Sequence, residues 1–219
     1  MMNCLRKKKF FMKFLEVKLN EIPKKCYVNK FLHKNIFYEK IAISPSVKEE
    51  FINQVDRITW LYKISPDTIG ISKTNNVEEI EVFQLDLKEK IIPKNVIKVI
   101  KKGIPYKILF LLKYNDEYCY LLKIDDIYNL EWNKDINIDF NAINLEVLYE
   151  NIVKTFIGKK DDIRNFEIII DEKNRIDELN KKIVNLRNKI KSEKQFDRKL
   201  EMNTELNKLL KEMEEINNE

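Results

Sequence analysis

Apolar side chains recur at helical spacing in three segments of the first two thirds of the chain. The spacing predicts amphipathic helices over 46–63, over 93–102 and over 144–158. Gly103 follows the second of these helices in the position where a left-handed cap would end it. The buried stripe expected for the first helix is Phe51, Val55, Ile58 and Tyr62.

Alternating or continuous apolar runs predict the strands between these helices. Residues 79–88 should form an interior strand, and 106–114 with 117–124 should form a hairpin that turns at Asn115 and Asp116. Residues 136–140 alternate and would add an edge strand, while the segment 16–42 fits a short helix or turns. The order of elements predicts an α+β fold, a small mixed sheet with packed helices.

The pattern changes after residue 170, where apolar positions repeat with heptad spacing. The first run is Ile176, Leu179, Ile183, Leu186 and Ile190, and the second is Met202, Leu206, Leu209, Met213 and Ile216. The two runs are out of phase with each other, which favours a helical hairpin that bends near 192–196 over a single long helix with a stutter. The C-terminal segment is thus expected to be a helical hairpin or coiled coil.

These patterns divide the chain into four parts. We expect a disordered basic leader over 1–12, an α+β domain over 13–158, a linker over 159–170 and the heptad segment over 171–219. Two starts of translation stay open, Met1 and Met12, and in the second case the leader would come from an upstream start codon. The heptad residues Ile176, Leu179, Ile183, Leu186, Ile190, Leu206, Leu209 and Met213 would either bind a partner's helices or pack within their own hairpin.

Composition excludes several classes of site. The chain of 219 residues has only three glycines and one histidine, so Walker loops, dinucleotide fingerprints, histidine triads and multi-histidine metal sites lack their residues. The three cysteines are far apart and odd in number, which favours reduced intracellular thiols over disulfides. No resident metal or cofactor is expected. His33 and Cys26 are interpreted as structural residues.

The termini and hydropathy give no sign of export or of a membrane anchor. Lys13 interrupts an apolar stretch near the start that is too short for a signal peptide, and no later run is long enough to span a bilayer. A cytoplasmic protein without a membrane partner is therefore expected.

The formal net charge of +5 is unevenly distributed. Residues 1–40 carry 11 basic and 3 acidic side chains, so the remainder of the chain is slightly acidic overall. Residues 88–107 are an exception, with seven lysines and one acid, Glu89. The side chains of Lys94, Lys98, Lys101 and Lys102 should lie opposite the apolar stripe of the 93–102 helix. That face either neutralises nucleic-acid phosphates or is a solvated face in a lysine-rich chain.

Two smaller patterns suggest further sites. Asp67 after Pro66, followed by Asp86 and Lys88, matches the outline P-D, spacer, D-x-K, in which paired acids hold Mg²⁺ and a lysine orients water in restriction-type nucleases. The same triplet also arises by chance in charged chains, and Asp67 would then only form a turn. Trp60, Tyr62 and Arg57 would either stack on a base or lie at the rim of the core.

Several longer stretches together resemble an uncharacterised bacterial family known only as a domain of unknown function. They are KCYVNKFLHKNIFYE, DRITWLYKISPDTIGI, EIEVFQLDLK, GIPYKILF and EKQFDRKLEMNTEL, and the resemblance extends from about Phe14 to Met213. Such proteins are often encoded beside a helicase and an adenine-type DNA methyltransferase in restriction-like or phage-defence loci. The resemblance implies no established activity.

Taken together, the patterns and the resemblance favour a non-enzymatic accessory subunit of a bacterial DNA restriction or phage-defence complex. It would bind a helicase or DNA methyltransferase subunit, with DNA as a further partner along the lysine face. Two alternatives stay open: a Mg²⁺-dependent restriction-type nuclease using Asp67, Asp86 and Lys88, and a homodimeric coiled-coil protein without a nucleic-acid role.

Overall fold

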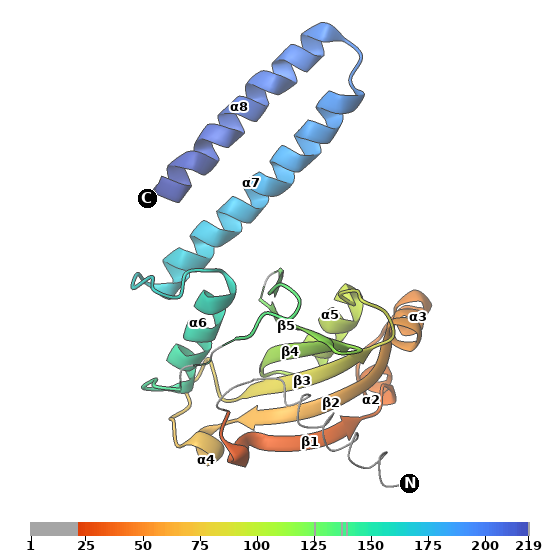
Figure 1. Ribbon diagram of the computed structural model, residues 1–219, viewed down its shortest axis with the longest axis vertical. Helices are drawn as coiled ribbons and strands as arrows, with labels where there is room; N and C mark the ends of the chain where they lie inside the picture. The colour runs from red at the N-terminus through yellow and green to blue at the C-terminus, as the bar shows by residue number, and fades with distance from the viewer. Residues whose placement is uncertain (1–21, 125, 137, 139, 219) are drawn as a thin grey trace, which may run out of the picture. The chain divides into compact units, whose positions relative to one another are not determined.

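The computed structural model describes residues 22–218, apart from 125, 137 and 139 (Figure 1). By its internal contacts the chain divides into two compact units, Met1–Lys160 and Asp161–Glu219, called unit 1 and unit 2. The leader predicted over 1–12 lies outside the described residues.

Within its described residues, unit 1 is built on one mixed sheet in which six strands lie side by side in chain order. The strands are β1 (Tyr27–Leu32), β2 (Val55–Ile64), β3 (Ile80–Leu87), β4 (Lys107–Tyr114), β5 (Glu117–Lys123) and β6 (Ile127–Asn129). Neighbours are antiparallel except β3 and β4, which are parallel because a helix carries the chain back between them. The predicted α+β class with a small mixed sheet is confirmed.

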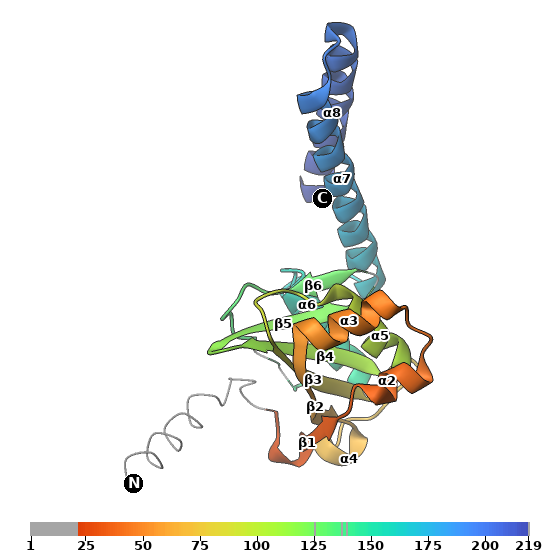
Figure 2. The same cartoon turned by 90° about the vertical axis from the view of Figure 1, so that its right-hand side faces the viewer.

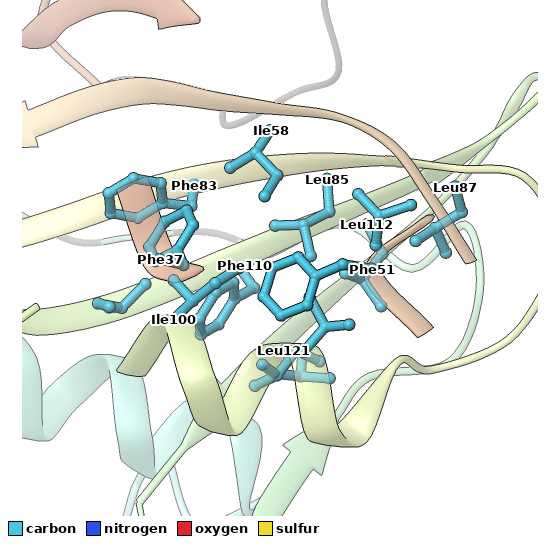
Figure 3. Packing of buried hydrophobic residues seen from close by; sticks show 14 of the residues in the cluster. Phe37, Phe51, Ile58, Phe83, Leu85, Leu87, Ile100, Phe110, Leu112 and Leu121 are labelled. Carbon is cyan, nitrogen blue, oxygen red and sulfur yellow. The ribbon is translucent and has the colours of Figure 1, made fainter. Parts of the chain in front are cut away.

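The helical segments of unit 1 are η1 (Lys24–Cys26), α2 (Asn35–Lys40), α3 (Pro45–Gln54), α4 (Pro66–Ile69), α5 (Lys94–Gly103) and α6 (Leu145–Phe156). Helices α2, α3 and α5 cover one face of the sheet (Figure 2). Phe37 of α2, Phe51 of α3 and Ile100 of α5 pack onto the sheet in a common core, which we call the main core (Figure 3). Its sheet residues are Ile58, Phe83, Leu85, Leu87, Phe110, Leu112 and Leu121. The second face carries the alternate residues of the same strands, and α6 contacts it at β5.

The helix predicted over 46–63 is wrong in its second half. Helix α3 ends at Gln54 and the chain continues as β2, with Ser44 Oγ accepting the backbone N–H of Val47 as the cap of α3. Strand β2 lies between β1 and β3, and its register against β3 shifts between Val55 and Arg57 and again between Trp60 and Tyr62. Each bulge adds a residue to the strand, so Val55 and Ile58 share the core face at a spacing of three, which matches helical spacing.

Three smaller predictions also need correction. Residues 16–42 contain the edge strand β1, which the sequence interpretation missed. The described residues among 136–140 form no strand, although Ile136 and Ile138 are buried, and the edge strand is β6 instead. Gly103 ends α5 without a left-handed backbone. An added Cβ at Gly103 would stand 3.0 Å from Ile41 Cδ1, so the Ile41 side chain would have to shift to make room.

Unit 2 is a hairpin of two long helices, α7 (Phe166–Ser192) and α8 (Phe196–Asn218), which lie side by side in both views (Figures 1 and 2). The chain turns at 193–195, so the helical hairpin is confirmed and a single long helix is excluded. Helix α7 begins at Phe166, inside the segment predicted as linker. The heptad residues Leu179, Ile183 and Leu186 are buried, and an Arg175–Glu212 ion pair of 2.9 Å joins the two helices.

Candidate functional site

The structure separates the two acids that the nuclease pattern paired. Asp67 lies on α4, beyond the end of β2, and is exposed. Asp86 is near the end of β3, opposite Arg57 at the start of β2. The eight residues from Arg57 to Ile64 span about 23 Å of strand, at about 3.3 Å for each of the seven steps. Asp67 and Asp86 therefore cannot share a metal ion. The prediction that Asp67 belongs to this site is wrong.

A different acid takes the place of Asp67 beside Asp86. The register of β2 against β3 shifts between Val55 and Arg57, so that Asp56 and Arg57 together stand opposite Asp86. This is the geometry of a β-bulge, a feature that re-aims side chains. The charge of Asp56 reaches Asp86, where it contributes to a raised pKa of the Asp86 carboxyl.

Further polar groups surround Asp86. Gln84 Nε2 donates to Asp86 Oδ1 at 2.7 Å, and Lys113 of β4 stands directly opposite Asp86 in the parallel register. Lys88 follows Asp86 by two residues, just past the end of β3. We call Asp56, Arg57, Asp86, Lys88 and Lys113 the strand-end site. It combines two carboxylates with three cationic side chains.

The electrostatics of the strand-end site are those of a partly desolvated charge cluster. Burial is the main cause that raises the pKa of Asp86, and Asp56 adds to it, while Gln84, Lys113 and Arg57 oppose the rise. Burial lowers the pKa of Lys113, and Asp86 partly offsets that effect. Two acids whose repulsion disfavours ionisation form a site that a bound cation would stabilise.

A lysine just before α2 completes the border of this site. Lys34 Nζ donates to the Val55 carbonyl at 2.6 Å, which fixes the ammonium beside the start of β2. Burial lowers the pKa of Lys34, the nearby Lys88 lowers it further, and Asp56 raises it. The two lysines and Asp56 therefore lie within electrostatic range of one another.

The predicted lysine face of α5 is divided by the structure. Lys94, Lys98 and Lys102 are exposed and follow one another at one-turn intervals, and we call them the α5 lysine row. Lys101 is different, because its Nζ donates to the Tyr106 carbonyl at 2.7 Å and burial lowers its pKa. Lys101 holds the turn between α5 and β4 and does not belong to the exposed face.

A buried carboxylate that the sequence interpretation missed lies at the opposite end of β3. Glu81 is 3 % exposed, and its Oε2 has no hydrogen-bond partner among the residues that the structure describes. Burial, together with a hydrogen bond to Glu79 and that residue's charge, raises the pKa of Glu81 to about 8. Glu79 pairs with Lys63 at 2.7 Å and lines a surface pocket of about 270 Å³ with Tyr106 and Lys107.

The aromatic pair suggested by the sequence is split between the two faces of the sheet. Trp60 packs against the main core and donates its Nε1–H to the Tyr62 carbonyl at 3.1 Å. Tyr62 contacts Tyr27 of β1, on the face that also carries Arg57. His33 packs edge-to-face on Phe31, while Cys26 is a buried thiol.

The heptad residues are engaged inside unit 2. Ile183 and Leu186 of α7 are buried, whereas Leu206, Leu209 and Met213 of α8 are half-buried. Ile176 and Ile190 are half-buried as well, and Leu179 is buried. The hairpin therefore already uses the seam that was predicted to bind a partner.

One known protein family matches most of the chain. The sequence pattern of a family described as a domain of unknown function, DUF4391, matches residues 21–213. The chain belongs to the DUF4391 family. No curated protein and no solved structure matches it significantly.

The DUF4391 match spans every strand of the sheet and most of the hairpin. The strand-end site, the α5 lysine row and Glu81 are thus all part of the DUF4391 domain. In the described part of the chain, no three His, Cys, Asp or Glu side chains are grouped to hold a metal ion. No helix among the described residues is long and apolar enough to cross a membrane.

Proposed function

We propose that this DUF4391 protein hydrolyses phosphodiester bonds in DNA with a Mg²⁺ ion held between Asp56 and Asp86. The bulge in β2 carries the proposal, because it brings Asp56 and Arg57 together opposite Asp86. Mg²⁺ is usually bound through one or two carboxylates and keeps several waters and substrate phosphates as its other ligands. Two acids are therefore a sufficient protein contribution.

The other side chains of the strand-end site suit the same reaction. In this reaction Lys88 would orient and polarise a water molecule, whose oxygen forms the new bond to phosphorus while the bond to the leaving sugar oxygen breaks. The water's proton passes to solvent, and the leaving oxygen gains one. Arg57 and Lys113 flank Asp86 from the neighbouring strands and supply positive charge for the phosphate oxygens.

The cleavage assay compares two aspartates. Asp86→Asn is expected to lower Mg²⁺-dependent cleavage of single- and double-stranded DNA by at least about 100-fold, because metal-ion stabilisation contributes several kcal/mol. Asp67→Asn, the matched control on α4, should cleave like the wild type. The measurement is the rate of product formation on gels, with Mg²⁺ or with EDTA. A wild-type protein without metal-stimulated cleavage, or equal loss in both variants, would refute the proposal.

A second candidate is a cytoplasmic accessory subunit of a restriction or phage-defence complex that binds DNA without cutting it. The α5 lysine row favours it, since Lys94, Lys98 and Lys102 present three cations at one-turn intervals to solvent. Phosphate contacts of this kind give binding without sequence preference. The family that the sequence resembles is often encoded beside a helicase and a DNA methyltransferase. In this candidate function, one of these two subunits would be the partner, and unit 2 would bind it.

Salt dependence tests the lysine row directly. Replacing Lys94, Lys98 and Lys102 by glutamine should flatten the slope of log affinity against log salt by about 0.9 for each phosphate that the variant no longer neutralises. The same change at Lys199, Lys208 and Lys211, exposed on α8, is the matched control. An unchanged slope would remove the row from any DNA interface. Co-purification of the helicase or methyltransferase, abolished by deleting 171–219, tests the partner.

A further inference from the structure

Two aromatic rings stand exposed on the edge strand β1. Tyr27 is 54 % exposed and Phe31 is 43 % exposed. Their cross-strand partners on β2 are Tyr62 and Thr59. The residues next to Thr59, Ile58 and Trp60, pack into the main core on the other face. Both rings therefore lie on the face of the sheet opposite α2, α3 and α5. We call Tyr27, Phe31 and Tyr62 the aromatic strip.

Two bulges bring these rings to one face. The β1–β2 register shifts between Tyr27 and Lys30, and the β2–β3 register shifts between Trp60 and Tyr62. Asn29 has a φ of 50°, in the left-handed region that asparagine tolerates better than most residues. The bulges also keep the outer strand irregular, which discourages pairing with another chain.

Neighbouring side chains hold the strip in place. The rings of Tyr27 and Tyr62 have centroids 5.6 Å apart, and Phe31 packs edge-to-face on His33 at 4.5 Å. The guanidinium carbon of Arg57 lies 5.3 Å from the centre of the Phe31 ring. Rings that are already supported on one side lose little freedom when a flat ligand stacks on the other.

The strip is continuous with the strand-end site. Arg57 contacts Phe31 and also stands opposite Asp86, which in turn stands opposite Lys113. The aromatic rings lie on β1 and β2, and the cations follow on β2 and β4. An unpaired nucleic-acid strand offers bases that can stack on such rings and phosphates that can pair with such cations. Arg57 and Lys113 lie beside Asp86 at the end of the strip, so a partner that stacks on the rings also meets charged groups there.

We propose that the aromatic strip binds the unpaired bases of single-stranded DNA, with Arg57 and Lys113 contacting the phosphates that follow. The inference rests on the proposed action on DNA and narrows its substrate to single strands. Bases in a duplex are stacked on one another, so their faces cannot reach Tyr27 or Phe31. Every base offers an aromatic face, so no sequence preference follows.

The test measures binding of a short fluorescent single-stranded DNA, in EDTA so that no cleavage occurs. Phe31→Ala and Tyr27→Ala should each weaken binding by about 5- to 150-fold, the range of base stacking on a single aromatic ring. Phe31→Trp should restore the affinity and report stacking by quenched tryptophan fluorescence. Phe196→Ala is the matched control, since Phe196 is 76 % exposed and lies in unit 2.

Each outcome decides one claim. Loss of single-strand binding in the alanine variants, with weaker binding of the same sequence as a duplex, supports the strip even if no cleavage is ever observed. Equal affinity of wild type and Phe31→Ala, or tighter binding of duplex, overturns it. If cleavage depends on Asp86 and binding does not depend on Phe31, the proposed nuclease function stands and the role of the aromatic strip is refuted.

Discussion

Glu81→Gln is expected to raise the free energy of unfolding by several kcal/mol at pH 8 and by little at pH 4. Folding raises the pKa of Glu81 from 4.5 to about 8. Between these values the folded protein keeps a proton that the unfolded chain releases, so the carboxyl lowers stability progressively as pH rises through this window. The full shift corresponds to at most about 5 kcal/mol.

Glutamine removes this penalty because it carries no titrating proton. Its amide can still donate to Glu79, as the protonated carboxyl does, and Glu79 keeps its pairing with Lys63. Urea unfolding of wild type and variant at several pH values between 4 and 9 measures the difference. Glu78→Gln is the matched control, because Glu78 is an exposed neighbour on the same approach to β3.

Parallel pH profiles for the wild type and Glu81→Gln would show that Glu81 is not held protonated. Ionisable groups held far from their ordinary pKa are concentrated at functional sites. The orphan Oε2 of Glu81 and the pocket lined by its partner Glu79 therefore mark this end of β3 for ligand screening.

The elements that the sequence predicted well are those whose signals are local. Helix α5 combines one apolar stripe with lysines on its other side, and the β4–β5 hairpin turns at Asn115, whose φ is 52°. The break between α7 and α8 was visible because two heptad runs were out of phase. Strand β2 was predicted wrongly because its two bulges break the alternation that identifies a strand.

Only part of the strand-end site could be predicted from the sequence. Asp86 and Lys88 share a strand end and a two-residue spacing, which a local motif captures. Asp56 could not be found in this way, because its position opposite Asp86 depends on a bulge that only the cross-strand register defines. Glu81 was missed for a related reason. A glutamate within an apolar strand suggests a solvent-facing position, and the contacts of Glu81 with Trp60 and Lys63 come from the neighbouring strand β2.

Ile183→Asp is expected to unfold the hairpin of unit 2 while unit 1 remains folded. Ile183 is 3 % exposed between α7 and α8, and an unpaired carboxylate there costs several kcal/mol. A two-helix unit has little stability to lose. Far-UV circular dichroism should lose most of the signal of these helices, whereas the fluorescence of Trp60 and Trp132, both in unit 1, should not change.

The neighbouring residue provides the control and separates a hairpin from an intermolecular coiled coil. Val184 is 54 % exposed, so Val184→Asp should leave the helical signal intact. If the heptad residues pair within one chain, light scattering should give the same molar mass for the wild type and for both variants. A wild-type dimer that Ile183→Asp converts to a monomer would instead assign the seam to a second copy, because a buried charge in a shared seam dissociates the partners.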